Sequence, residues 1–202
     1  AREHQIDAVV NRIKEKYTDY EVRLAFSSRI IVKRLRDRGI EIPTEQGALD
    51  ALIGEGYTDI YVQPLHFTGG EEFDKLKHNI LNHERAHELN TLRVGRPLVY
   101  YMGQEEHPND YQILIDTFVT SLSVSNEDGL LLVGHGGLGS GNSAYGYLQY
   151  QLIRSGLNHI RVATLENAPY VADIAVPWEW LDGKKPNKIY VHPLLLVLGD
   201  HA

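Results

Sequence analysis

Two histidines and one glutamate stand where they could bind a divalent metal ion. His135 and His201 each follow an apolar run, and Glu166 closes a third. Two imidazoles and one carboxylate make an open site for a borderline divalent metal, with coordination positions left for a substrate. Because the chain contains no cysteine, a transition-metal site in it must be built from imidazole and carboxylate.

The pattern around these residues is that of strands alternating with helices, which predicts an α/β fold with mostly parallel sheets covered on both faces. We expect strands over 20–26, 58–64, 97–102, 129–134, 159–166 and 187–193. We expect helices over 3–16, 28–38, 45–55, 71–89, 109–123, 142–155 and 170–182. Open parallel sheets bind ligands at the carboxyl ends of their strands, and His135, Glu166 and His201 all fall at such ends.

An internal repeat divides the chain. The hexapeptide IYVQPL, which starts at Ile60, returns as IYVHPL at Ile189, an offset of 129 residues with five of six residues identical. An offset of that size matches one small α/β domain rather than a solenoid unit. We therefore predict two similar domains, over residues 1–125 and 126–202, with the metal site in the second.

The same offset makes a prediction about the two ends. The strand at 129–134 opens the second copy, so its counterpart would lie at about residue zero. The helix and strand that follow Gly70 in the first copy have no counterpart after Ala202. We therefore expect the first domain to lack its first strand and the second to lack its carboxy-terminal part.

The segment GHGGLG, which starts at Gly134, admits other interpretations. It fits the G-x-G-x-x-G pattern of dinucleotide-binding loops, and Glu166 lies where such proteins carry a ribose-binding acid. Against this, a histidine in second place would crowd the tight turn toward the pyrophosphate. The glycines could also serve only as a tight turn between a strand and a helix.

Further candidates for substrate binding lie near other strand ends. His66 follows the first copy of the repeated strand, and it is either a substrate-binding residue or a structural histidine. Ser28 and Arg29 begin a basic helix, whose cations could bind a polycarboxylate or simply form a solvated face. Gly136, beside His135, is assigned to the same substrate surface.

Three more histidines, His78, His83 and His87, fall on the predicted helix over 71–89. Only His83 and His87, four residues apart, would share a face of that helix. A solvated surface is the ordinary interpretation of this pattern, and a haem or accessory metal contact is the alternative.

Composition restricts the classes of function. A net charge of −7 argues against nucleic-acid binding, which needs a basic surface. No apolar run reaches the roughly 18 residues that span a bilayer, and the charged start AREHQ is unlike a signal peptide. We expect a cytoplasmic protein that does not bind membranes. A periplasmic location and a homo-oligomeric state are left open.

Several segments resemble the anaerobic sirohydrochlorin cobaltochelatases, a family of ATP-independent chelatases. They are LLVGHG, ATLEN with the proline that follows it, VHPLLLVLGDHA, AFSSRIIVKRL and VQPLHFTGGEEF, and they are spread over most of the chain. The resemblance implies two similar chelatase-like α/β domains facing each other across a cleft, with metal contacts at His135, Glu166 and His201. One departure is the glycine-rich GLGSG after the GHG motif.

The function that the resemblance implies is insertion of Co²⁺ into the tetrapyrrole sirohydrochlorin, in cobalamin biosynthesis, without an organic cofactor. Fe²⁺, Ni²⁺ and Zn²⁺ are the other candidate metals. Our hypothesis is that His135 and His201 hold the metal near the ring, one of them also accepting a pyrrole proton, while Glu166 completes the coordination. Two alternatives stay open: a haem- or metal-binding relative without insertion activity, and a nucleotide-dependent oxidoreductase.

Overall fold

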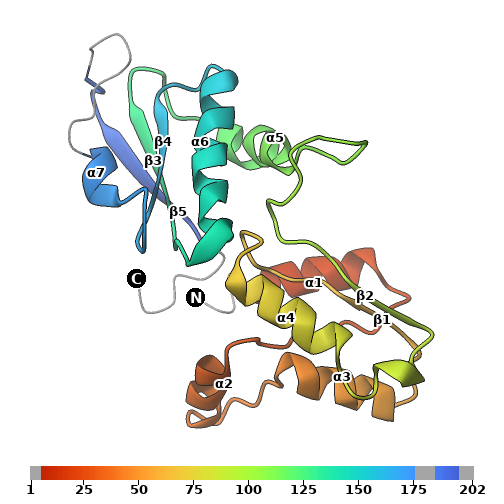
Figure 1. The fold of residues 1–202 in the computed structure, drawn as a ribbon. Coiled ribbons are helices and arrows are strands. Elements are labelled where there is room, and N and C mark those ends of the chain that lie inside the picture. Colours follow the sequence, from red (N-terminus) through yellow and green to blue (C-terminus); the bar gives the residue numbers. More distant parts are fainter. Residues whose placement is uncertain (1–5, 176–184, 196–202) are drawn as a thin grey trace. The chain divides into compact units, whose positions relative to one another are not determined.

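The structure is a computed structural model that describes residues 6–175 and 185–195. The chain divides into two compact units, each with its own parallel sheet. Of the described residues, the first unit comprises 6–64 and 72–95, and the second comprises 65–71, 96–175 and 185–195. Helices flank both sheets (Figure 1), so the predicted α/β class is confirmed.

The first unit is built on a two-stranded sheet. Its elements are α1 (Ile6–Lys16), α2 (Arg29–Arg36), α3 (Glu45–Gly54), β1 (Asp59–Val62), α4 (Glu71–Leu81), the 3-10 helix η1 (Ala86–Glu88) and β2 (Thr91–Val94). Strands β1 and β2 run parallel, with Ile60 opposite Leu92. The core of this unit joins Ile60 to Leu49 and Ile53 of α3 and to Ile80 of α4.

Two helices of this unit begin where a hydroxyl side chain caps them. The Ser28 hydroxyl accepts a hydrogen bond from the Ile31 N–H at 3.4 Å, and the Thr44 hydroxyl accepts one from the Gly47 N–H at 3.2 Å. A cap of this kind stabilises a helix by about 1 kcal/mol. Capping explains why α2 and α3 start within a residue of the predicted positions.

The second unit is built on a three-stranded parallel sheet with strand order β4-β3-β5. Its elements are α5 (Asp110–Leu114), the π-helix η2 (Ile115–Val119), the 3-10 helix η3 (Thr120–Leu122), β3 (Gly129–Gly134), the 3-10 helix η4 (Gly139–Asn142), α6 (Ser143–Arg154), β4 (Ile160–Thr164), α7 (Val171–Ala175) and β5 (Ile189–Leu194). Figure 1 shows α6 on one face of this sheet and α7 on the other.

Strand β3 is buried on both faces, as its continuous apolar run predicts. Leu130 and Leu132 pack into a cluster with residues of α5 and α6. Leu131 and Val133 point the other way and pack with residues of β4 and α7. Burying one leucine fully stabilises a fold by about 1.5–3 kcal/mol. Strand β3 is therefore a stable support for the turn that begins at its carboxyl end.

The first copy of the repeated hexapeptide begins in β1, which ends at Val62, and the second copy forms β5. Strand β5 pairs with β3, Ile189 opposite Gly129. By the 129-residue offset, the counterpart of β3 in the first unit falls outside the described residues. Residues 96–125 pack with the second unit. The repeat, in contrast, predicts a domain boundary after residue 125. That boundary remains a prediction drawn from the repeat.

Two predicted strands are absent from the described structure. Residues 20–26 and 97–102 form only isolated bridges, such as Phe26 with Thr44 and Val99 with Thr68. Apolar and aromatic residues favour an extended backbone in both segments, but a strand also needs a continuous partner. The local sequence shows the tendency to an extended backbone, but it does not show whether a partner strand is present.

The helix predicted over 71–89 ends at Leu81. The Asn82 side chain donates a hydrogen bond to the His78 carbonyl at 2.9 Å. Asparagine side chains compete in this way with the helical backbone for its acceptors. Neither this helix nor any other in the described part of the chain has the length and apolar character needed to cross a membrane.

Candidate metal centre

The parallel pairing of β3 with β4 continues beyond the ends of both strands. Within the strands, Gly134 lies opposite Thr164. Beyond them, the Leu165 N–H donates to the Gly134 carbonyl at 3.0 Å and the Glu166 N–H donates to the His135 carbonyl at 2.9 Å. The backbone therefore places His135 beside Glu166 at the carboxyl end of the sheet, the edge where parallel sheets bind ligands.

The side chains of His135 and Glu166 also approach each other. Nδ1 of His135 lies 3.9 Å from Oε2 of Glu166, and the side chains are 47% and 55% exposed. An incoming ion or substrate can therefore reach both.

A second contact of His135 assigns the tautomer of its ring. Nδ1 lies 3.0 Å from the carbonyl oxygen of Gly136. A carbonyl oxygen only accepts hydrogen bonds, so Nδ1 carries a proton and the lone pair of the neutral ring lies on Nε2. Metal-binding histidines commonly have this arrangement, with one N–H on a carbonyl and the other nitrogen presented to the metal.

Gly136 is required by the contact between the two loops. Its φ of +83° lies in the left-handed region, and a Cβ added to it would lie 1.7 Å from the Glu166 carbonyl oxygen. A side chain at this position would push the two loops apart. The second glycine of GHG is thus a steric requirement for bringing His135 beside Glu166.

Two asparagines connect the loop after β3 to the loop after β4. The Asn142 side chain accepts a hydrogen bond from the Gly137 N–H at 3.2 Å and donates to the Ala168 carbonyl. The Asn167 side chain donates to the Gly137 carbonyl at 3.1 Å. We call these contacts the asparagine clamp. They tie the loop that carries His135 to the loop that carries Glu166.

The loop after β4 folds back onto the end of its own strand. The Thr164 hydroxyl donates to the Asn167 carbonyl at 2.7 Å, and the Thr164 N–H donates to the Pro169 carbonyl at 2.7 Å. Thr164 is buried, and the Ala168–Pro169 peptide is cis. The motif ATLEN with its proline therefore builds a compact turn that holds Glu166 at the sheet edge.

The third predicted ligand, His201, lies outside the described residues. Within residues 6–175 and 185–195, no group of three or more histidine and acidic side chains is arranged to hold a metal ion. The structure thus brings together two of the three predicted ligands. The full site of His135, Glu166 and His201 stays a prediction.

His66 belongs to the second unit, the unit that contains His135. Its carbonyl accepts a hydrogen bond from the Leu98 N–H at 3.0 Å. Further along the same segment, Gly70 lies against Gly141, where an added Cβ would be 2.4 Å from the Gly70 Cα. The segment that carries His66 therefore packs against the 3-10 helix that follows the GHG turn. A role of His66 in substrate binding remains a prediction.

This packing also weighs against the dinucleotide interpretation. In a dinucleotide-binding loop the helix N-terminus is open to the pyrophosphate. Here the 3-10 helix η4 lies between the glycine-rich loop and α6, and Gly70 covers it at Gly141. At Gly141, part of the approach that a pyrophosphate would need is occupied by the backbone of Gly70.

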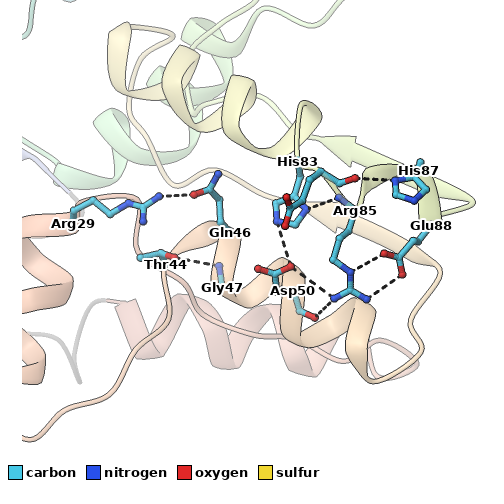
Figure 2. Close-up of polar contacts among 10 residues, drawn as sticks. Arg29, Thr44, Gln46, Gly47, Asp50, His83, Arg85, His87 and Glu88 are labelled. Atoms are coloured by element: carbon cyan, nitrogen blue, oxygen red, sulfur yellow. Dashed lines mark hydrogen bonds and ion pairs between the residues drawn. The ribbon is translucent and has the colours of Figure 1, made fainter.

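Ser28 and Arg29 have structural partners in the first unit. Ser28 caps α2, as described above. The Arg29 guanidinium donates to the Gln46 side chain at 2.7 Å (Figure 2). It also lies 3.6 Å from the Glu45 carboxylate. Arg29 thus links α2 to the start of α3. Binding of a substrate by Ser28 and Arg29 stays a prediction.

The histidines predicted on one long helix occupy three different elements. His78 lies in α4, His83 in the turn after it, and His87 in the 3-10 helix η1, so the shared face predicted for His83 and His87 is wrong. Nδ1 of His83 accepts from the Arg85 N–H at 3.2 Å, and Nε2 lies 3.5 Å from Asp50 (Figure 2). Both ring nitrogens of His83 are engaged by neighbours, which favours a structural role.

Asn142 contributes to the site without having been singled out in the sequence. Neither its residue type nor its spacing distinguishes it from any other asparagine near a helix start. Asn167 carried a weak signal, because asparagine is one of the few residues that tolerate the left-handed φ of +63° found there.

Comparison with known proteins gives a consistent result over the whole chain. The family model described as cobalt chelatase (CbiK) matches residues 1–202. A sirohydrochlorin cobaltochelatase of Salmonella typhimurium is 31% identical over 187 residues, which cover 91% of this chain and 66% of that protein. The sirohydrochlorin cobaltochelatase CbiKC of Nitratidesulfovibrio vulgaris is 26% identical over 193 residues, covering 95% and 65%. The chain thus spans just under two thirds of the length of these curated relatives.

Proposed function

We propose that this chain, which belongs to the cobalt chelatase (CbiK) family, inserts a divalent metal ion, Co²⁺ first of all, into sirohydrochlorin. Family membership agrees with the resemblance found in the sequence, and both curated relatives carry the name sirohydrochlorin cobaltochelatase. The observation that carries the proposal is the accessible pair of His135 and Glu166 at the end of β3 and β4.

Metal insertion requires two events at one place. The macrocycle must give up two pyrrole protons, and the cation must shed its bound water. The lone pair on Nε2 of His135 can bind the metal or accept a pyrrole proton. Glu166 supports entry of the metal, because its carboxylate, 3.9 Å from the His135 ring, lowers the free-energy cost of bringing in a dication.

His201 supplies the second imidazole in this proposal. A site of two histidines and one carboxylate holds the metal while leaving positions for the ring nitrogens. The metal is a substrate that leaves with the product, and neither ATP nor an organic cofactor is used. Because imidazole and carboxylate follow the general affinity order of divalent metals, Fe²⁺, Ni²⁺ and Zn²⁺ are competing substrates.

The test is a metallation assay on the full-length protein. Sirohydrochlorin absorbance is followed with Co²⁺, Fe²⁺, Ni²⁺, Zn²⁺ or no metal, for the wild type and for His135→Ala and His201→Ala. The matched control is His78→Ala, which removes an exposed histidine of α4. We expect fast metallation by the wild type and by the control, and loss of the acceleration in the other two variants.

The other outcomes each identify a different function. Binding of sirohydrochlorin without faster metallation would mean a carrier rather than an enzyme. Absence of tetrapyrrole binding would refute the proposal. A thermal shift with NAD(P), without binding of the tetrapyrrole, would favour the alternative function of a nucleotide-dependent oxidoreductase.

A further inference from the structure

A buried tyrosine of α6 lies directly behind the turn that carries His135. Tyr145 is 3% exposed. A Cβ added to Gly134 would lie 2.1 Å from the Cε1 atom of the Tyr145 ring and 2.9 Å from its hydroxyl oxygen. The ring therefore packs against the backbone of β3 at the residue just before His135, and Gly134 is needed to admit it.

The hydroxyl of Tyr145 holds the backbone of the turn. It accepts hydrogen bonds from the N–H groups of His135 and Gly136. Burial raises the pKa of Tyr145, and the two donors only partly offset that effect, so the phenol is neutral at physiological pH and its oxygen remains an acceptor. Buried N–H groups require acceptors, and one oxygen serves two successive groups here.

Tyr145 is itself held from its other side by Phe67. The two rings stack with centroids 5.5 Å apart and an angle of 15° between their planes. Phe67 follows His66, and its carbonyl accepts a hydrogen bond from the Val99 N–H at 3.0 Å. The tyrosine is therefore fixed between the GHG turn and the segment that carries His66.

We propose that Tyr145 is a positioning residue for metal insertion, whose hydroxyl fixes the backbone of His135 and so the direction in which the imidazole is presented. This inference rests on the proposed function. The hydroxyl acts through His135. Removing it leaves the ring packing in place and takes away only the acceptor of two N–H groups. Groups that orient a metal-binding histidine typically change metal affinity or activity by about 10–100-fold when they are lost.

The experiment compares Tyr145→Phe with Tyr111→Phe in the full-length protein. Tyr111 is an equally buried tyrosine of the second unit, on α5, which packs edge-on against Tyr147 at 4.7 Å. Each variant loses one buried hydroxyl. We expect Tyr145→Phe to lower kcat for Co²⁺ insertion by about tenfold or more, with KM for sirohydrochlorin little changed. Tyr111→Phe should keep both constants.

A second measurement reports on the backbone alone. Amide hydrogen exchange of His135 and Gly136 should accelerate in Tyr145→Phe, while that of Leu132 stays slow in both variants. Unchanged exchange at His135 and Gly136, or wild-type kcat in Tyr145→Phe, would overturn the proposal. If the wild type itself fails to insert metal, the proposed function is wrong, and the exchange rates still decide whether the hydroxyl holds the turn.

A third variant separates the hydroxyl from the ring stack. Phe67→Leu removes the stacked ring and keeps the Tyr145 hydroxyl. We expect protected amides at His135 and Gly136 and a smaller loss of kcat than in Tyr145→Phe. A loss as large as in Tyr145→Phe would show that ring packing controls the site and would contradict the role assigned to the hydroxyl.

Discussion

The two units each contain a histidine beside a carboxylate, and the two pairs differ in what surrounds them. In the second unit, His135 and Glu166 lie 3.9 Å apart and the imidazole is 47% exposed. In the first unit, His83 and Asp50 lie 3.5 Å apart and the imidazole is 5% exposed. The separation is similar in both, so a histidine and a carboxylate in proximity do not by themselves indicate a metal site.

The ring nitrogens distinguish the two pairs. Nδ1 of His83 accepts from a backbone N–H and Nε2 faces Asp50, so both nitrogens serve the fold. Nδ1 of His135 is turned toward the Gly136 carbonyl, which puts the lone pair of the ring on Nε2. Exposure and tautomer together make the second pair suited to chemistry, whereas the first joins α3 to the turn after α4.

Alanine at each histidine should separate the pairs most strongly. His135→Ala should lower the metallation rate by about 10²–10⁴-fold, as loss of a proton acceptor does, and change the free energy of unfolding by no more than about 0.5 kcal/mol. His83→Ala should keep the rate and lose about 1–3 kcal/mol, because a buried imidazole and both of its hydrogen-bonding contacts are removed. Metallation rates and urea unfolding measure both. Loss of activity in proportion to lost stability in both variants would remove the distinction.

Neutralising each carboxylate should give the next largest difference. Glu166→Gln removes the charge that attracts the cation, and we expect Co²⁺ affinity to fall about tenfold or more. Asp50→Asn keeps an oxygen that can accept from His83 and should cost less than about 1 kcal/mol, with no change in Co²⁺ affinity. Titration with Co²⁺ and thermal unfolding provide the comparison. Equal Co²⁺ affinity in wild type and Glu166→Gln would exclude Glu166 as a ligand.

Opening the asparagine clamp should have a smaller effect on activity. Asn142→Ala removes the bonds to Gly137 and Ala168, which should cost about 1–2 kcal/mol and lower kcat by less than the Glu166 change does. The control is Asn79→Ala in the first unit, where the Asn79 side chain donates to Glu45 at 2.9 Å. That variant should lose stability and keep kcat. A full rate in Asn142→Ala would mean that the loops hold their spacing without the clamp.

The smallest effect concerns a structural histidine within the second unit. Burial lowers the pKa of His159, which lies before β4 and donates to the Val124 carbonyl. The unfolded chain therefore takes up this proton at a higher pH than the folded chain does. The stability that His159 contributes is present above its unfolded pKa of about 6.5 and is lost as the pH falls through its folded pKa.

Urea unfolding between about pH 7 and about pH 5 tests this assignment. His159→Gln should lose less stability on acidification than the wild type does, because the substituted side chain takes up no proton. An unchanged pH dependence would show that His159 is not among the groups that make the fold acid-sensitive.

The parts of the fold that follow from local pattern were predictable. The apolar run over 129–134 forms β3 with the same bounds. The second copy of the repeated hexapeptide forms β5, and the first copy begins in β1. The proximity of His135 and Glu166 also followed from the sequence, because parallel strands bring their carboxyl ends to one edge. The third member of that set, His201, is untested.

The parts that depend on distant partners were not predictable. Residues 97–102 are apolar and aromatic, as strands often are, yet whether a strand forms depends on a neighbour that the local pattern does not specify. Asn142 and Tyr145 act on the GHG turn through contacts fixed only when α6 packs on the sheet. Likewise, the grouping of His66 with His135 depends on the contact of Gly70 with Gly141, which involves no polar side chain.

The backbone hydrogen bonds that continue past the ends of β3 and β4 set the spacing of the site. Because the Glu166 N–H bonds to the His135 carbonyl, the spacing of the two side chains is set by the strand register rather than by loop flexibility. Side chains alternate between faces along a strand, so deleting one residue from β4 would present Asn167 where Glu166 now stands and turn the side chains between the deletion and Asn167 to the opposite face. Single substitutions at this site can lower its activity by degrees. A change in the length of β4 would instead remove Glu166 from its place beside His135 in one step.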